Sequence, residues 1–223
     1  MYYTKYRPQK FSDISRTNDI ADIIANQVKS GKTAHAYLMV GPRGTGKTTL
    51  ARVLAKSLNC TNLKKNGDPC DECSNCVSIR NGSFIDLIEI DAASNRGIDD
   101  IRDLKDKIRL APTMGSNKVY IIDEVHMLTT EAFNALLKTL EEPPKKTTFF
   151  LCTTEEHKVP ATIKSRCQIF KLKRPTIKQI VSVLKDISKE ESIDITDEDL
   201  SKIAEASMGD YRGACVLLEQ VHD

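Results

Sequence analysis

One short segment of the chain strongly limits how the residues around it can fold. Residues 41–48 read GPRGTGKT, which matches the G-x-x-x-x-G-K-[ST] pattern of a phosphate-binding loop. A strand-like apolar run, residues 37–40, precedes this loop, and a helical pattern, residues 48–58, follows it. A strand, a glycine loop and a helix in this order turn backbone N–H groups and the positive helix end toward one point. The segment therefore predicts a nucleoside triphosphate site on an α/β fold.

The residues of this loop have distinct expected roles. The glycines let backbone amides face phosphate oxygens, and Lys47 is expected to neutralise the β- and γ-phosphates. Thr48 is expected to bind Mg²⁺ through its hydroxyl group. The nucleotide-binding residues expected here are Gly41, Pro42, Arg43, Gly44, Thr45, Gly46, Lys47, Thr48 and Thr49.

A pair of acidic residues completes the predicted site. Asp123 and Glu124 directly follow the strand-like run 119–122. Asp123 is expected to hold Mg²⁺ through a bound water, and Glu124 to orient or deprotonate the attacking water. A glycine turn and a strand that ends in two surface acids is the simpler interpretation, but it does not account for both motifs in this order.

Strand-like and helical patterns alternate along the first 170 residues. Strand-like runs at 37–40, 85–90, 119–122 and 148–152 are separated by helical patterns at 48–58, 98–108 and 130–140. This alternation predicts a parallel sheet flanked by helices. Three helical segments follow Phe170, at 177–189, 197–206 and 211–221. They predict a small all-helical second domain, with Thr176 and Thr196 as N-caps.

Four cysteines lie between the loop and the acidic pair, with the spacing C-x9-C-x2-C-x2-C. Four thiolates would give a closed tetrahedral zinc site with a structural role, because no position is left for water. An iron–sulfur cluster remains an alternative, since C-x2-C-x2-C also occurs in ferredoxins, and so do buried thiols without metal. The candidate zinc ligands are Cys60, Cys70, Cys73 and Cys76.

Composition narrows the class of protein and its location. No apolar run is long enough to span a bilayer, and no export signal is visible, so we expect a cytoplasmic protein without a membrane partner. Seven cysteines without such a signal agree with a reducing compartment. The net charge of +2 excludes a strongly basic coat protein but leaves DNA binding undecided.

Four further segments of the sequence have recognisable motifs. They read YRP at 6–8, DLIEIDAAS at 86–94, IDEVHML at 122–128 and FNALLKTLEEPP at 133–144. Together with the loop and the four cysteines, they make the chain resemble the gamma/tau subunits of bacterial DNA polymerase III, which are ATP-hydrolysing motors of sliding-clamp loaders in the AAA+ class. The resemblance covers nearly the whole chain.

This resemblance implies a domain organisation. A RecA-like AAA+ P-loop ATPase domain would span residues 1–173, with the zinc module inserted at about 59–78, and a helical lid would span 174–223. ATP, with Mg²⁺, would lie between them. The family's third domain, a helical collar that assembles the subunits, is not expected in this sequence. We therefore expect the isolated chain to be monomeric or weakly associating.

The resemblance also assigns roles to single residues. Arg166, in the sequence Ser-Arg-Cys, would act as an arginine finger on the γ-phosphate held by a neighbouring subunit. Thr154, favoured over Thr153, would sense the γ-phosphate. Arg212 would contact the nucleotide from the lid, although Gly213 stands where the family usually has Asp. A surface arginine and a threonine at a strand end are the ordinary alternatives.

Two further groups of residues are assigned in the same way. Tyr6, Arg7 and Pro8 would border the adenine, which ordinary N-terminal packing does not exclude. The start of the 98–108 helix would face DNA, so that residues just before it touch phosphates; a solvated, salt-paired helix explains its charges equally well. These residues are Ser94, Asn95 and Arg96.

The resemblance implies a motor subunit that uses ATP to load the sliding clamp onto primed DNA. Its partners would be delta-type and delta-prime-type subunits, the sliding clamp and primer-template DNA. A nucleotide-dependent scaffold subunit with little ATP turnover is the main alternative, although the presence of Lys47 and Glu124 argues against it. A small-molecule P-loop kinase is a third, but it would need an acceptor pocket and has no use for a cysteine cluster.

Overall fold

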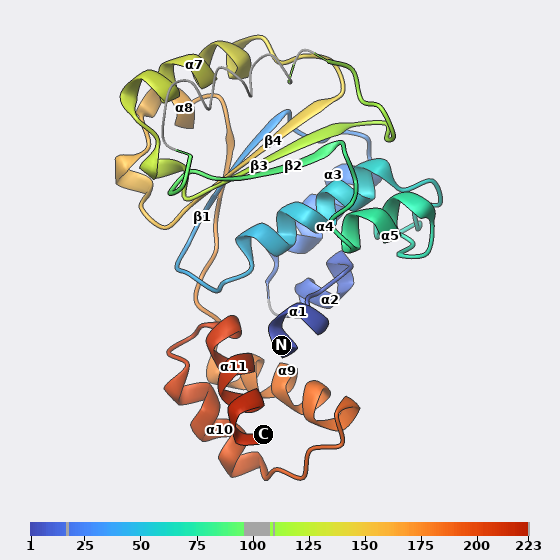
Figure 1. Cartoon of the computed structure of the whole chain (residues 1–223), viewed down its shortest axis with the longest axis vertical. Coiled ribbons are helices and arrows are strands. Elements are labelled where there is room, and N and C mark those ends of the chain that lie inside the picture. The colour runs from blue at the N-terminus through green and yellow to red at the C-terminus, as the bar shows by residue number, and fades with distance from the viewer. Residues whose placement is uncertain (17, 96–107, 109, 223) are drawn as a thin grey trace.

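A computed structural model describes residues 1–16, 18–95, 108 and 110–222 of the chain. Within these residues the strands form one parallel sheet in the order β2-β3-β4-β1-β5 (Figure 1). The predicted parallel sheet is therefore confirmed, and β5 is an additional edge strand. The strands are β1 (Ala36–Val40), β2 (Leu87–Asp91), β3 (Lys118–Asp123), β4 (Thr147–Thr153) and β5 (Gln168–Lys171).

Helices cover both faces of the sheet (Figure 1). One face packs on α3 (Ile20–Lys29) and α4 (Lys47–Asn59), and the other packs on α7 (Thr130–Glu141) and α8 (Ala161–Lys164). Successive side chains of a strand point to opposite faces, so Tyr37 joins the cluster of α4 while Leu38 joins that of α7. The central strands are buried on both faces, as in other parallel sheets.

The C-terminal part is helical, as predicted. It contains α9 (Ile177–Glu190), α10 (Asp197–Ala206) and α11 (Tyr211–His222) around an apolar cluster of its own. Both expected N-caps are present, because the hydroxyls of Thr176 and Thr196 accept hydrogen bonds from the amides three residues ahead, at 3.3 and 3.2 Å. We call these three helices the helical layer.

Shorter helices connect the main elements. The N-terminal helix α1 lies beside the helical layer, and its Tyr2 is part of the apolar cluster there (Figure 1). The N-terminus thus reaches the C-terminal helices. The short helices are α1 (Tyr2–Lys5), α2 (Phe11–Ser15), α5 (Ser74–Arg80), and the 3₁₀ helices η1 (Val125–Met127) and η2 (Glu156–Lys158).

Strand β2 begins two residues later than the apolar run 85–90 suggests. Ile85 is 64% exposed, whereas Asp86 is 0% exposed and accepts backbone hydrogen bonds from Thr113, Met114 and Gly115 at 2.6–2.9 Å. The carboxylate therefore anchors a turn next to the sheet before the strand starts. The helix predicted at 98–108 falls outside the described residues, apart from residue 108.

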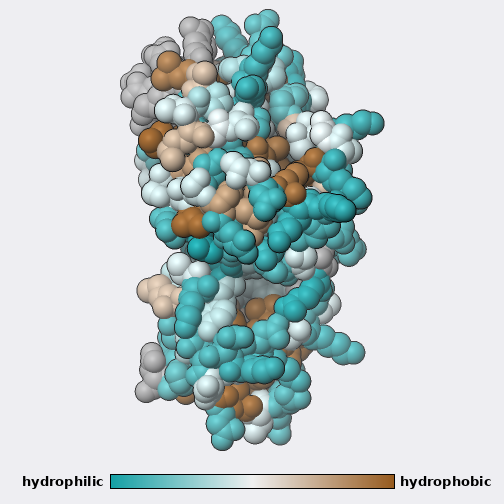
Figure 2. Space-filling model, turned by 90° about the vertical axis from the view of Figure 1, so that its right-hand side faces the viewer, coloured by the Kyte–Doolittle hydropathy of each residue, from teal (hydrophilic) through white to brown (hydrophobic). Residues whose placement is uncertain are grey.

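One face of the molecule is mainly polar (Figure 2). We call the sheet with its flanking helices α3, α4, α7 and α8 the α/β body. The face in Figure 2 has only scattered hydrophobic residues, and it narrows between the α/β body and the helical layer. Among the helices of the described residues, none has the length and apolar character needed to cross a bilayer.

Candidate nucleotide-binding site and cysteine cluster

The glycine loop lies between β1 and α4, as the sequence predicts. Gly44 and Gly46 adopt left-handed φ angles of 74° and 92°, which fold the loop around the first turn of α4. Lys47 is 7% exposed, and its ammonium donates to the carbonyls of Gly41 and Pro42 at 2.8 and 2.9 Å. Burial lowers the pKa of Lys47, whereas the nearby acidic groups oppose this shift. Two backbone carbonyls of the loop therefore hold the Lys47 ammonium inside it.

The acidic pair meets the loop at the carboxyl ends of the strands. Thr48 Oγ1 donates to Asp123 Oδ2 at 2.9 Å, so the two expected Mg²⁺-binding groups lie together. Glu124 has a left-handed φ of 48°, and its carboxylate accepts a hydrogen bond from Thr154 Oγ1 at 3.2 Å. The structure thus brings the expected base and the expected sensor into contact.

A cleft of about 660 Å³ lies between the α/β body and the helical layer. Tyr6, Arg7 and Pro8 form part of its wall, and Arg212 contributes from α11. Burial lowers the pKa of Arg7, and the nearby cations Arg52 and Arg212 add to this effect. Most of the predicted nucleotide-binding residues line this cleft. They are Tyr6, Arg7, Pro8, Arg43, Gly44, Thr45, Gly46, Lys47, Thr48, Thr49 and Arg212, together with Asp123 and Glu124.

The residue before α11, Asp210, contacts the loop directly. The amides of Arg212 and Gly213 donate to Asp210 Oδ1 at 2.8 and 3.1 Å, which caps the start of α11. The same carboxylate lies against Gly44, where a Cβ atom would be 1.8 Å from Oδ1. The guanidinium of Arg212 stacks over the Tyr3 ring at 5.3 Å. Sequence reasoning missed Asp210, whose only local signal was its place before a helix.

His126 is a second residue of the site for which no role was predicted from the sequence. Its side chain is 5% exposed, and Nδ1 lies 2.9 Å from Thr153 Oγ1 and 3.5 Å from Glu124 Oε2. Its Nε2 lies 3.2 Å from Glu155 Oε1. The ring therefore bridges the segment after β3 and the segment after β4, both of which carry groups of the site. Its position two residues after Glu124 was the only signal in the sequence.

Arg166 does not line the cleft of its own chain. It follows α8, where one guanidinium nitrogen donates to Thr162 O at 2.7 Å and the other to Glu141 Oε1 at 2.6 Å. Its side chain is 32% exposed, so it can be reached from outside the molecule.

The residues expected to face DNA are only partly described. The Ser94 hydroxyl donates to Asp91 Oδ2 at 3.1 Å, and the Asn95 amide donates to Asp91 O at 3.0 Å. Both side chains fold back onto the end of β2 in this structure. Arg96 lies outside the described residues.

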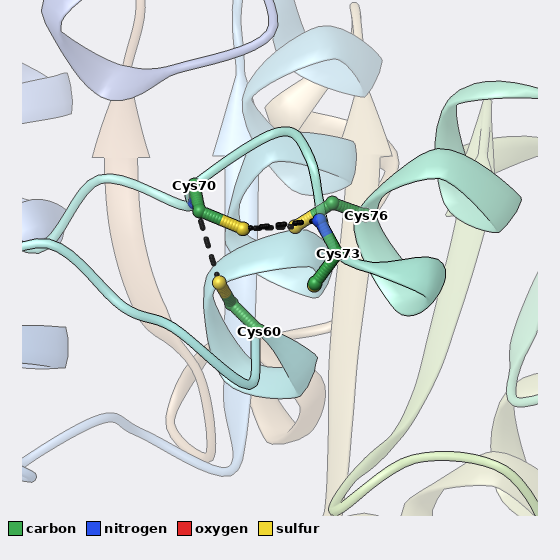
Figure 3. A group of neighbouring side chains, drawn as sticks. All are labelled: Cys60, Cys70, Cys73 and Cys76. Carbon is green, nitrogen blue, oxygen red and sulfur yellow. Dashed lines mark hydrogen bonds between the residues drawn. The ribbon is translucent and has the colours of Figure 1, made fainter.

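The four clustered cysteines converge, as Figure 3 shows for the end of α4, the following loop and the start of α5. Their sulfur atoms all lie within 4.8 Å of one another. The four sulfur atoms around a tetrahedral zinc ion are about 3.8 Å from one another, given Zn–S bonds of about 2.3 Å. A four-iron cluster holds one thiolate at each iron and spreads them farther apart. The spacing therefore fits a single tetrahedral ion better.

The surroundings of these thiols also suit a metal site. The amides of Asn62 and Cys70 donate to Cys60 Sγ at 3.4 and 3.3 Å, and that of Cys73 donates to Cys70 Sγ at 3.3 Å. Burial opposes ionisation of Cys73, but hydrogen bonds from the Cys76 and Thr61 amides and the Thr61 hydroxyl lower its pKa to about 6. N–H groups directed at sulfur favour the thiolate form that binds metal, and at Cys73 they outweigh burial, whereas burial raises the pKa of Cys60 and Cys76.

The fold and the loop place the chain in the RecA-like AAA+ class of P-loop proteins. A solved structure titled Thermotoga maritima RuvB, a Holliday junction branch migration motor, superposes with a TM-score of 0.70 at 20% identity, over 97% of this chain and 65% of that one. At this identity the likeness concerns the fold alone.

Sequence comparisons define the family. A family model described as "DNA polymerase III, delta subunit" matches residues 16–176. DNA polymerase III subunit tau of Bacillus subtilis is 50% identical over 98% of this chain and 38% of its own length. Subunit tau of Escherichia coli is 48% identical over 97% of this chain and 33% of its own length. The chain belongs to the DNA polymerase III gamma/tau family, and it spans less than two fifths of these two relatives.

Proposed function

We propose that this chain is the ATP-binding and ATP-hydrolysing motor subunit of a DNA polymerase III clamp loader. One observation carries the proposal: Thr48 of the glycine loop donates to Asp123 at 2.9 Å, and the adjacent Glu124 accepts from Thr154 at 3.2 Å. A pocket that only bound nucleotide would need the loop, but not a base held by a sensor hydroxyl.

The loop and α4 would bind the triphosphate. Backbone amides between Gly44 and Thr48 and the N-terminal end of α4 provide donors for phosphate oxygens. Lys47, which now donates to two loop carbonyls, would exchange them for the β- and γ-phosphates. Arg212 would reach the phosphates from α11, and residues 6–8 would border the adenine.

Hydrolysis would depend on groups at both sides of the γ-phosphate. Glu124 would orient the attacking water and take up its proton, and Thr154, whose hydroxyl donates to that carboxylate, would sense the γ-phosphate. Magnesium, held by Thr48 directly and by Asp123 through water, would neutralise charge on the β- and γ-phosphates. Arg166, exposed and outside its own cleft, would serve a neighbouring subunit's ATP.

The family membership supports the assignment of partners. We propose delta-type and delta-prime-type subunits, a sliding clamp and primer-template DNA as partners, with Ser94, Asn95 and Arg96 near DNA phosphates. The four-cysteine cluster would bind one zinc ion and stabilise its loop. We expect the cytoplasm as the location, and we expect stable assembly to require a collar segment in addition to residues 1–223.

Steady-state ATP turnover tests this function. The chain is assayed alone and then with the other clamp-loader subunits, the clamp and primed DNA; a second set uses the chain joined to the remaining segment of the Bacillus subtilis tau relative. We expect weak turnover alone and a clear rise in the complete mixture, because Arg166 must come from a neighbour. Glu124→Gln should keep ATP binding and lose about 100-fold or more in turnover.

Matched controls separate chemistry from folding. Lys47→Ala should lose ATP binding, whereas Glu131→Gln, an exposed carboxylate on α7, should change neither binding nor turnover. Tight ATP binding without turnover in either mixture would favour a scaffold subunit. Turnover that survives in Glu124→Gln would show that another residue is the base.

A further inference from the structure

The cysteine cluster is packed against the N-terminal segment that borders the cleft. We call residues 60–76 the cysteine knuckle. Gly67 of the knuckle lies so close to α3 that a Cβ atom there would be 2.5 Å from the Ala25 carbonyl oxygen. Asp68 is 5% exposed, and its carboxylate accepts a hydrogen bond from the amide of Ser12 at 3.1 Å. The knuckle and the N-terminal segment therefore share an interface.

A buried lysine connects the two segments more closely. Lys56 of α4 is 2% exposed, and its ammonium donates to Asp71 of the knuckle and to the side-chain oxygen of Gln9. Asp71 has a left-handed φ of 65° and also accepts from Arg80 at 3.1 Å. Because a buried cation is strongly unfavourable without partners, the positions of Asp71 and Gln9 depend on each other through Lys56.

Gln9 carries this connection to the wall of the cleft. Its side-chain amide donates to the Arg7 carbonyl at 2.8 Å, and its backbone amide donates to Asp13 Oδ2 at 3.1 Å. Arg7 and Pro8 line the cleft beside the glycine loop. A continuous set of hydrogen bonds thus runs from Asp71 through Lys56 and Gln9 to the segment expected to border adenine.

We propose that Asp71, Lys56 and Gln9 are positioning residues that couple metal binding at the cysteine knuckle to adenine nucleotide binding in the cleft. The inference rests on the proposed function, since it takes the cleft as the ATP site. A metal ion fixes the four thiolates, and with them the turn that presents Asp71 to Lys56. When the metal leaves, Lys56 loses a defined partner and Gln9 no longer holds the Arg7 carbonyl in place.

Isothermal titration of the chain with ATP and with inorganic tripolyphosphate tests the coupling. Both ligands are measured on the zinc-loaded protein and on protein stripped by a chelator. We expect zinc removal to weaken ATP binding about fivefold or more, within the usual range of coupling between sites. Tripolyphosphate affinity should stay within about twofold, because the glycine loop binds phosphates without residues 6–8.

Coupling between two sites is reciprocal, which gives a readout independent of nucleotide titration. ATP should raise the affinity for zinc, measured by competition with a coloured chelator, by the same factor. Zinc affinity that does not respond to ATP would overturn the proposal.

Variants test the hydrogen-bonded connection while zinc stays bound. Gln9→Ala should weaken ATP binding about as much as zinc removal does, and zinc removal should then have little further effect on ATP affinity. Asp71→Asn should also weaken ATP binding, and asparagine tolerates the left-handed φ at this position. Glu72→Gln, an exposed carboxylate in the knuckle, is the control and should change nothing.

The outcomes distinguish this inference from the proposed function. Zinc-loaded protein that does not bind ATP would contradict the proposed function itself. ATP affinity that is equal with and without zinc would refute only the coupling. Equal losses of affinity for ATP and tripolyphosphate would also refute the coupling. They would indicate a general loosening of the fold and not a displacement of the residues expected to border adenine.

Discussion

Asp86 allows a quantitative prediction about how the edge of the sheet is held. Its carboxylate is fully buried and accepts from three consecutive amides, those of Thr113, Met114 and Gly115. In Asp86→Asn the side-chain NH₂ group must face N–H donors, so at least one amide loses its anionic acceptor. Such a hydrogen bond contributes about 1.5–3 kcal/mol, and an unpaired buried donor costs about 1–3 kcal/mol. We expect Asp86→Asn to lower the free energy of unfolding by roughly 3 kcal/mol at pH 7.

The pH dependence of this loss has a defined sign. Burial alone would raise the pKa of Asp86, but the three amides and Lys118 together lower it below its ordinary value. A carboxyl whose pKa is lowered by folding stabilises the native state above its unfolded pKa of about 3.9, and this stability is lost as the pH falls further. The difference in the free energy of unfolding between wild type and Asp86→Asn should therefore be largest near neutral pH and shrink below about pH 4.

Urea denaturation followed by circular dichroism at several pH values measures this effect. Asp194→Asn, an exposed loop carboxylate, is the matched control and should change the unfolding free energy by less than about 0.5 kcal/mol. An unchanged midpoint for Asp86→Asn at pH 7 would refute the reasoning. A loss that is the same at pH 7 and pH 3 would show that shape, and not charge, makes Asp86 necessary.

Three other substitutions test separate parts of the site. Gly44→Ala should lower the free energy of unfolding by about 1–2 kcal/mol and weaken ATP binding, because φ is 74° and Asp210 occupies the space of a Cβ atom. A variant with the melting temperature and the ATP affinity of the wild type would argue against this contact. Cys73→Ser should lose bound zinc and lower the melting temperature, and retention of zinc in elemental analysis would exclude Cys73 as a ligand. Thr154→Val should reduce ATP turnover about tenfold or more at unchanged ATP affinity, and equal turnover would show that Glu124 needs no partner there.

The parts of the site that the sequence could predict have local signals. Residues 41–48 match their motif in a fixed spacing, and the structure places this segment as a loop between β1 and α4, as the motif predicts. The four cysteines likewise lie within one short segment, and their sulfur atoms converge. The glycine loop and the cysteine cluster each lie within a short segment of the chain, so their local geometry depends little on the rest of the fold.

What the sequence could not predict depends on pairs far apart along the chain. Lys56 contacts Gln9, and Asp210 contacts Gly44, but no periodicity relates these positions. Strand β5 was missed for a different reason: only Phe170 of its four residues is buried, so it carries no apolar run. Partners that arise from tertiary packing become visible only when the sheet and the helical layer are in place.

Helix α11 also connects the glycine loop to the N-terminal helix. The amide of Tyr211, its first residue, donates to a carbonyl of the glycine loop at 3.3 Å, and Arg212 beside it stacks over the Tyr3 ring of α1. Its last residue, His222, lies 2.7 Å from the Tyr2 hydroxyl, also in α1. A helix of twelve residues is a rod about 18 Å long that does not shorten. A shift of the loop that moves α11 would therefore also move the first residues of the chain.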